Sequence, residues 1–243
     1  MGEKEREEKI VKQIAVSYLL LRKAIGFLGI AFPFILFLGC LFYTLLFHDK
    51  CDYWQSSISC YYHTVMRNAF VGVLWIFGIF LFFYRYDTLD NILTSVAGAC
   101  AIGISLFPTN VVDCTTCGDI IFCKNEAVGY LHLACAGSFF GILSYISIKL
   151  FTRTNQEKPD ADKLFRNSIY KFCGWAIVVF MSLSGIYIVL LKLEILNLEK
   201  IRLIFCLETG MLWAFGISWI VKGEVELKKL MKRLIQSFVA MFK

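Results

Sequence analysis

Six long apolar stretches constrain the fold of this chain more than any other feature of its sequence. They cover residues 24–47, 68–84, 92–107, 129–151, 172–191 and 201–221. Helices of such length, rising about 1.5 Å per residue, can cross roughly 30 Å of bilayer hydrocarbon. Only 18% of the residues are charged and 58% are hydrophobic, which excludes an ordinary soluble domain, where about a quarter is charged. We therefore predict an all-α, polytopic membrane protein with about six transmembrane helices.

Lysine and arginine are distributed unevenly about these stretches. Most of the 25 lysine and arginine residues lie at the N-terminus, at the C-terminus and in the connection between the fourth and fifth stretches. The positive-inside rule then predicts that both termini are cytoplasmic. The formal net charge of +6 thus reflects membrane topology, and it implies no nucleic-acid partner. We expect the protein in a plasma membrane or a bacterial inner membrane.

The C-terminal segment, residues 224–243, differs from the six stretches. Its apolar residues recur at helical spacing, while Lys228, Lys229, Lys232 and Arg233 fall on the opposite side. This pattern predicts a basic amphipathic helix that lies on the inner leaflet and binds anionic lipids. It would follow a transmembrane domain over residues 1–223. The same apolar face could instead contact a second copy of the chain or a partner protein.

Two features predict how the spans are shaped and packed. Pro33 stands inside the first stretch, where a proline kinks a helix. Gly137 and Gly141 form a small-xxx-small pattern in the fourth stretch, which lets helices approach closely. We expect these glycines to pack within the chain, with a homo-oligomer contact as the alternative.

The ten cysteines fall into two groups. One half lies inside the apolar stretches, and the other half lies in the two long connections predicted to be outside. The outside cysteines are Cys51, Cys60, Cys114, Cys117 and Cys123. Clustering in an oxidising compartment is typical of disulfides, and the spacing leaves their pairing open. Cys114 and Cys117 could also form a redox pair or half of a zinc site, although no second CxxC motif or nearby histidine completes a metal set.

A few ionisable residues lie at similar depths near the outer ends of three spans. His63 and Arg67 lie at the start of the second span, His132 about one turn inside the fourth, and Glu208 about two turns inside the sixth. Because ionisable groups are costly inside a membrane, they are candidates for function. The pattern predicts one outward-facing polar pocket. Its candidate residues are Ser59, Tyr61, His63, Arg67, Asn68, His132 and Glu208.

Each of these residues also has a structural interpretation. His132 could be hydrogen-bonded within the bundle, and Glu208 could form an ion pair with Arg67 that hides both charges. Tyr61 could belong to the aromatic belt at the membrane interface. A polar lock that only holds helices together therefore competes with a binding pocket.

Ser59-Cys-Tyr-Tyr-His63 forms an S-x-x-x-H element. In this element the chain resembles the superfamily of multi-span membrane hydrolases that contains alkaline ceramidases and progestin/adipoQ receptors. The resemblance implies a zinc ion that activates water against a lipid amide, with Ser59 and His63 as the matching residues. The second span lacks the aspartate of that pattern, and the chain has no H-x-x-x-H pair. Zinc would need His63, His132 and Glu208 as ligands with water in the fourth position, and Arg67 nearby would weaken cation binding.

We favour a non-enzymatic protein and assign no catalytic residue. In this hypothesis the pocket conducts or binds a small solute, an ion or a lipid headgroup. Arg67 would attract an anionic group, His63 and His132 would make binding sensitive to pH, and Glu208 would be a buried counter-charge or proton carrier. A metal-dependent membrane lipid hydrolase is one alternative, recognised by bound zinc and a cleaved lipid. A membrane scaffold or effector subunit that acts through the C-terminal helix is another.

Overall fold

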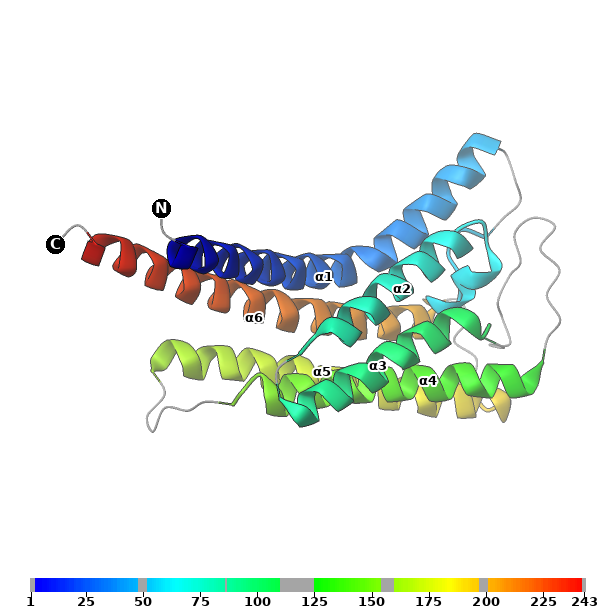
Figure 1. The fold of residues 1–243 in the computed structure, drawn as a ribbon. Coiled ribbons are helices and arrows are strands. Elements are labelled where there is room, and N and C mark those ends of the chain that lie inside the picture. The colour runs from blue at the N-terminus through cyan, green and yellow to red at the C-terminus, as the bar shows by residue number, and fades with distance from the viewer. Residues whose placement is uncertain are drawn as a thin grey trace.

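A computed structural model describes residues 3–47, 52–85, 87–109, 125–153, 160–196 and 201–241. Within these ranges the chain forms six α-helices and no strand, which confirms the predicted all-α fold (Figure 1). A 3₁₀ helix, η1 (Ser59–His63), precedes α2, and a π-helix, η2 (Ile146–Leu150), follows α4. The α-helices are α1 (Glu3–Phe47), α2 (Arg67–Phe83), α3 (Thr88–Leu106), α4 (Glu126–Tyr145), α5 (Ala161–Lys192) and α6 (Leu203–Met241).

Five helical segments are long and apolar enough to cross a membrane. They are Gln13–Phe47, Thr88–Leu106, Glu126–Leu150, Ala161–Lys192 and Leu203–Glu224. The remaining apolar helix, α2, has 17 residues and a length of about 25 Å. The chain is therefore a polytopic membrane protein with five long apolar helices, and a sixth crossing by α2 stays a prediction.

The terminal helices are longer than the sequence analysis proposed. Helix α1 begins at Glu3, well before the apolar stretch, and α6 continues from Leu203 to Met241 without a break at residue 223. No proline interrupts α6, so its hydrogen-bond ladder can continue past the membrane segment. The predicted C-terminal segment is thus helical and continuous with α6, and its position on the inner leaflet stays a prediction.

The helices run back and forth between two ends of a bundle (Figure 1). The N-terminal end of α1 and the C-terminal end of α6 lie at one end, together with the start of α3 and the start of α5. The opposite end carries η1, the starts of α2, α4 and α6, and the end of α5. We call these the terminal end and the η1 end. This alternation matches the predicted order of crossings, whereas the side of the membrane on which each end lies stays a prediction.

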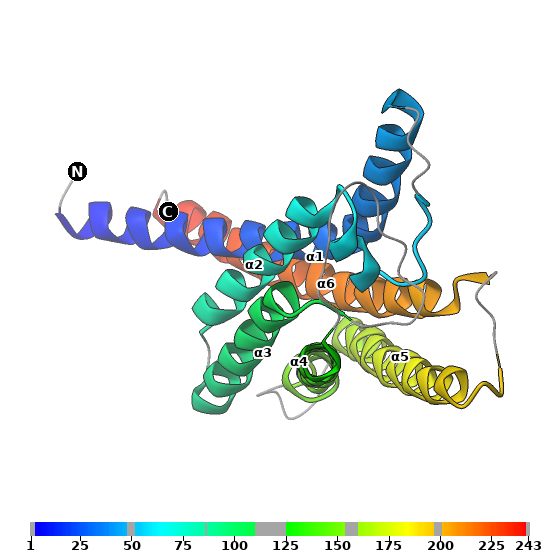
Figure 2. The same cartoon turned by 90° about the vertical axis from the view of Figure 1, so that its right-hand side faces the viewer.

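Helix α1 packs mainly against α6, and two glycines set their distance. A Cβ atom added to Gly26 would lie 2.7 Å from the carbonyl oxygen of Gly216, and one added to Gly216 would lie 2.5 Å from that of Gly26. No side chain fits in either place. Beyond this crossing α1 bends away from α6 (Figures 1 and 2). Pro33 lies inside α1 and accounts for a bend because it lacks the N–H that a helix needs there.

Gly137 and Gly141 do not have the predicted packing role. A Cβ atom on either residue would meet nothing within 4 Å in the described part of the chain, so the expectation that they bring α4 close to another helix of the chain is wrong. Helix α4 approaches α5 farther along, where Ser144 Oγ donates a hydrogen bond of 2.9 Å to the carbonyl oxygen of Gly174. Ser144 lies on the same face of α4 as Gly137 and Gly141, so this face comes close to α5 only near the end of α4.

The α1–α6 crossing generates a stability prediction. Gly216→Ala should lower the stability of the detergent-solubilised protein by about 1–3 kcal/mol, because the added methyl group forces the two backbones apart. Thermal unfolding followed by tryptophan fluorescence measures the change. Gly141→Ala is the matched control, since its methyl group enters open space. Equal melting temperatures for the two variants would contradict a glycine-dependent crossing.

Candidate functional site

The segment from Gln55 to Thr64 is buried at every position, although it lies outside the long helices. Six of these ten residues are polar, and buried polar groups need hydrogen-bond partners. Part of that requirement is met locally: Thr64 Oγ1 donates to the carbonyl oxygen of Tyr61 at 2.9 Å, and Ser57 Oγ donates to Cys60 Sγ at 3.2 Å. Further partners come from α4, α6 and the end of α3. We call residues 55–64 the η1 segment.

Helix α6 holds the η1 segment through its first turns. The carboxylate of Glu208 accepts a hydrogen bond of 2.5 Å from the backbone N–H of Ile58. The backbone N–H of Phe205, which has no partner four residues back within its own helix, donates to the carbonyl oxygen of Ser56 at 3.0 Å. Arg202 forms an ion pair with Asp52 just before the segment. Glu208 therefore contacts backbone, and among the described residues it forms no ion pair with Arg67.

His132 on α4 joins the η1 segment to the end of α3. Its Nδ1 atom lies 2.7 Å from the carbonyl oxygen of Phe107, and its Nε2 atom lies 3.0 Å from Ser59 Oγ. Because a carbonyl oxygen can only accept, the Nδ1 atom carries the proton and Nε2 accepts from the serine hydroxyl. The His132 side chain is 1% exposed. Both ring nitrogens are thus engaged within the protein.

His63 makes a second tie to the same region. Its Nε2 atom lies 3.0 Å from the carbonyl oxygen of Thr109, beyond the end of α3, and its ring packs edge-on against Tyr62.

Tyr61 bonds to the chain just before the η1 segment. Its hydroxyl donates to the carbonyl oxygen of Tyr53 at 2.7 Å, and its side chain is fully buried. That burial raises the pKa of Tyr61 above the ordinary tyrosine value, because the phenolate would lose its hydration.

The proposed zinc ligands are not assembled as a set. Within the described ranges, no three histidine, cysteine, aspartate or glutamate side chains are grouped closely enough to hold a metal ion. His63 and His132 bind separate carbonyl groups, and Glu208 binds the backbone of the η1 segment. The arrangement of these three residues is that of a polar lock.

Arg67 and Asn68 belong to a different part of the η1 end. They line a cavity of about 710 Å³ between the start of α2 and the end of α3. The Arg67 guanidinium lies 4.5 Å above the Tyr62 ring and donates from Nη2 to the Tyr62 hydroxyl at 2.8 Å. We call this space the Arg67 cavity. Its lining residues are Tyr62, Arg67, Asn68, Val71, Gly72, Trp75, Ser105 and Leu106.

Of these eight lining residues, only Arg67 and Asn68 were predicted as site residues from the sequence. Gly72, Trp75 and Ser105 sit within apolar stretches, where neither charge nor spacing distinguishes them. A Cβ atom on Gly72 would meet nothing within 4 Å, so this glycine leaves the cavity open. Trp75 contributes a wide apolar wall and is 40% exposed.

The structure describes six of the ten cysteines. Cys40, Cys100, Cys135, Cys173 and Cys206 are free thiols, whereas Cys60 is disulfide-bonded. The other outside cysteines, Cys51, Cys114, Cys117 and Cys123, lie outside the described residues. Their pairing stays a prediction.

Comparison with known proteins adds no family. The chain matches no protein-family model, no curated protein and no solved structure. The resemblance to multi-span hydrolases therefore rests on its five residues alone.

The Ser59–His132 contact can be tested by stability. Ser59→Ala leaves the Nε2 atom of a buried histidine without a partner, and we expect a loss of about 1–3 kcal/mol. Ser168→Ala is the matched control, because Ser168 is exposed and its hydroxyl bonds only to its own helix. Chemical denaturation in mild detergent measures both variants. A Ser59→Ala protein as stable as its control would show that the Ser59–His132 contact contributes nothing to stability.

Proposed function

We propose that this integral membrane protein binds an anionic group, either a lipid headgroup or a small solute anion, in the Arg67 cavity. The observation that carries the proposal is an arginine held in one orientation on the wall of an accessible cavity of mixed polarity. The η1 segment then serves as the support that positions Tyr62, and with it Arg67. Binding, rather than catalysis, is the activity we assign.

The chemistry of the lining favours an anion. A guanidinium presents N–H donors in a planar fork that matches phosphate and carboxylate groups, and stacking on Tyr62 restricts its motion. No lining residue is acidic. The cavity also lies at the start of α2, where the dipole of the helix favours negative charge. Asn68 and Ser105 add neutral polar groups beside the arginine.

The bundle interior supports binding over conduction. Its core is filled by large side chains, among which Tyr61, Phe77 and Trp219 are at most 1% exposed. A conducting path would need an open polar route through this region, where these large side chains are packed. Anionic-lipid binding by the C-terminal helix remains a separate proposal, supported by its basic amphipathic sequence.

One contact favours a second candidate function. The hydroxyl of Ser59 donates to a neutral imidazole, the arrangement used by serine nucleophiles and their bases. A membrane lipid hydrolase would exploit this pair, with or without the metal that the resemblance implies. Ser59 does not line the Arg67 cavity, so substrate would need another route. Metal analysis of the purified protein and a lipid-cleavage assay with Ser59→Ala test this alternative.

The charge of Arg67 gives the first binding prediction. Arg67→Gln should weaken anion binding roughly 10–100-fold, the effect of losing hydrogen bonds from a charged donor. Two probes distinguish the sources: inorganic phosphate titrated by calorimetry, and phosphatidylglycerol retained on the protein in native mass spectrometry. Lys192→Gln is the control, because Lys192 contacts Tyr130 at the same end and does not line the cavity. The proposal is contradicted if the wild type binds neither probe. It is also contradicted if the two variants bind the probes equally well.

The shape of the Arg67 cavity gives the second binding prediction. Gly72→Leu should abolish binding while preserving stability, because the leucine side chain enters space where a Cβ atom meets nothing within 4 Å. The same titrations measure binding, and thermal unfolding shows that the fold is intact. Unchanged binding by a stable Gly72→Leu protein would place the anion elsewhere.

A further inference from the structure

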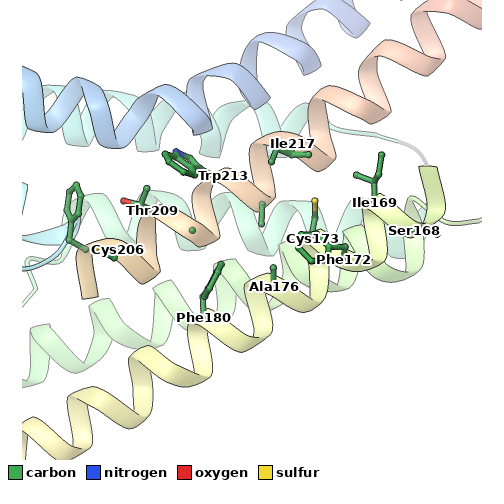
Figure 3. A pocket seen from close by; sticks show the side chains of 13 residues that line it. Ser168, Ile169, Phe172, Cys173, Ala176, Phe180, Cys206, Thr209, Trp213 and Ile217 are labelled. Atoms are coloured by element: carbon green, nitrogen blue, oxygen red, sulfur yellow. The ribbon is translucent and has the colours of Figure 1, made fainter. Parts of the chain in front are cut away.

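A second cavity, of about 730 Å³, lies between α5 and α6 (Figure 3). It shares no lining residue with the Arg67 cavity. Its walls are almost entirely apolar and include Ile169, Ala176 and Phe180 on α5 and Trp213 and Ile217 on α6. We call it the α5–α6 groove.

The groove is elongated and runs along both helices. Its walls follow α5 from Ser168 to Phe180 and α6 from Phe205 to Ile217, which at 1.5 Å per residue corresponds to about 18 Å along each helix. The two helices are antiparallel neighbours, so Ser168 and Ile217 lie at one end of the groove and Phe180 and Cys206 at the other (Figure 3). Both walls belong to segments able to span the membrane. The groove therefore opens where the surrounding solvent is lipid hydrocarbon.

Charge marks one end of the groove. Arg166 precedes Ile169 by about one turn of α5 and falls in line with Cys173, two turns along the same face. Within the described ranges Arg166 forms no ion pair. It lies toward the terminal end, which the cation distribution predicts to be cytoplasmic. An apolar slot with a basic residue at its interfacial end is complementary to an anionic lipid.

We propose that the α5–α6 groove binds one acyl chain of an anionic phospholipid of the inner leaflet, with the phosphate at Arg166. The inference is independent of the function proposed for the Arg67 cavity. Ala176 contributes to the room for the chain, and the exposed faces of Phe172 and Trp213 flank its path. Arg166 then selects anionic over zwitterionic headgroups.

Photo-crosslinking in nanodiscs tests the proposal. The full-length protein is reconstituted in phosphatidylcholine with a minor fraction of phosphatidylglycerol that carries a diazirine in one acyl chain, and the adducts are mapped by peptide mass spectrometry. We expect adducts concentrated on the groove walls. Ala176→Trp should remove most of them by filling the groove, whereas Val189→Trp should not, because Val189 is exposed on α5 beyond the end of the groove.

The headgroup is tested in the same assay. Arg166→Gln should lower the yield with phosphatidylglycerol roughly fivefold, the effect of one basic residue near an anionic lipid, and should leave the yield with diazirine-labelled phosphatidylcholine unchanged. Lys171→Gln is the control, because Lys171 is exposed on α5 and does not line the groove. Adducts spread evenly over all lipid-facing helices would overturn the proposal. So would a groove closed by a second copy, detected as a chain-to-chain crosslink through the exposed thiol of Cys206.

Discussion

The polar backbone of the η1 segment must be hydrogen-bonded, and the arrangement of the η1 end depends on this requirement. A buried peptide group without a hydrogen-bond partner costs about 1–3 kcal/mol, so buried irregular backbone is tolerated only where other protein groups pair with it. Glu208 pairs with the N–H of Ile58, and His132 binds both Ser59 and the end of α3. One segment therefore links α3, α4 and α6 and leaves Arg67 at the rim, beside Tyr62.

The terminal end is held by different forces. There Arg22 is fully buried, with its guanidinium 4.7 Å from the Tyr84 ring and a 2.6 Å hydrogen bond from Nη2 to the Tyr84 hydroxyl. A buried arginine is stabilised when aromatic faces and a hydroxyl replace its hydration. Gly26 and Gly216 keep α1 and α6 close beside it. Packing and cation–π contacts thus help to hold this end, and backbone pairing helps to hold the other.

Hydropathy alone located the apolar helices, because crossing hydrocarbon requires long apolar runs. It also placed His132 and Glu208 at similar depths, and both do contact the η1 segment. Depth, however, does not give the rotation of a helix about its axis. From depth alone we therefore predicted that Arg67 and Glu208 line one pocket, whereas Arg67 lines a separate cavity. The Gly26–Gly216 crossing joins residues from the two ends of the chain, and no local motif marks it.

The central claim is that the η1 segment is a fixed structural element that supports the Arg67 cavity. Hydrogen–deuterium exchange of the wild-type protein in nanodiscs tests it most directly. The account predicts that the amide of Ile58, bound by the Glu208 carboxylate, exchanges as slowly as amides in the middle of α6. Exchange of residues 55–64 as fast as that of an exposed loop would contradict the account, because a mobile segment could not hold Tyr62 and Arg67 in one orientation.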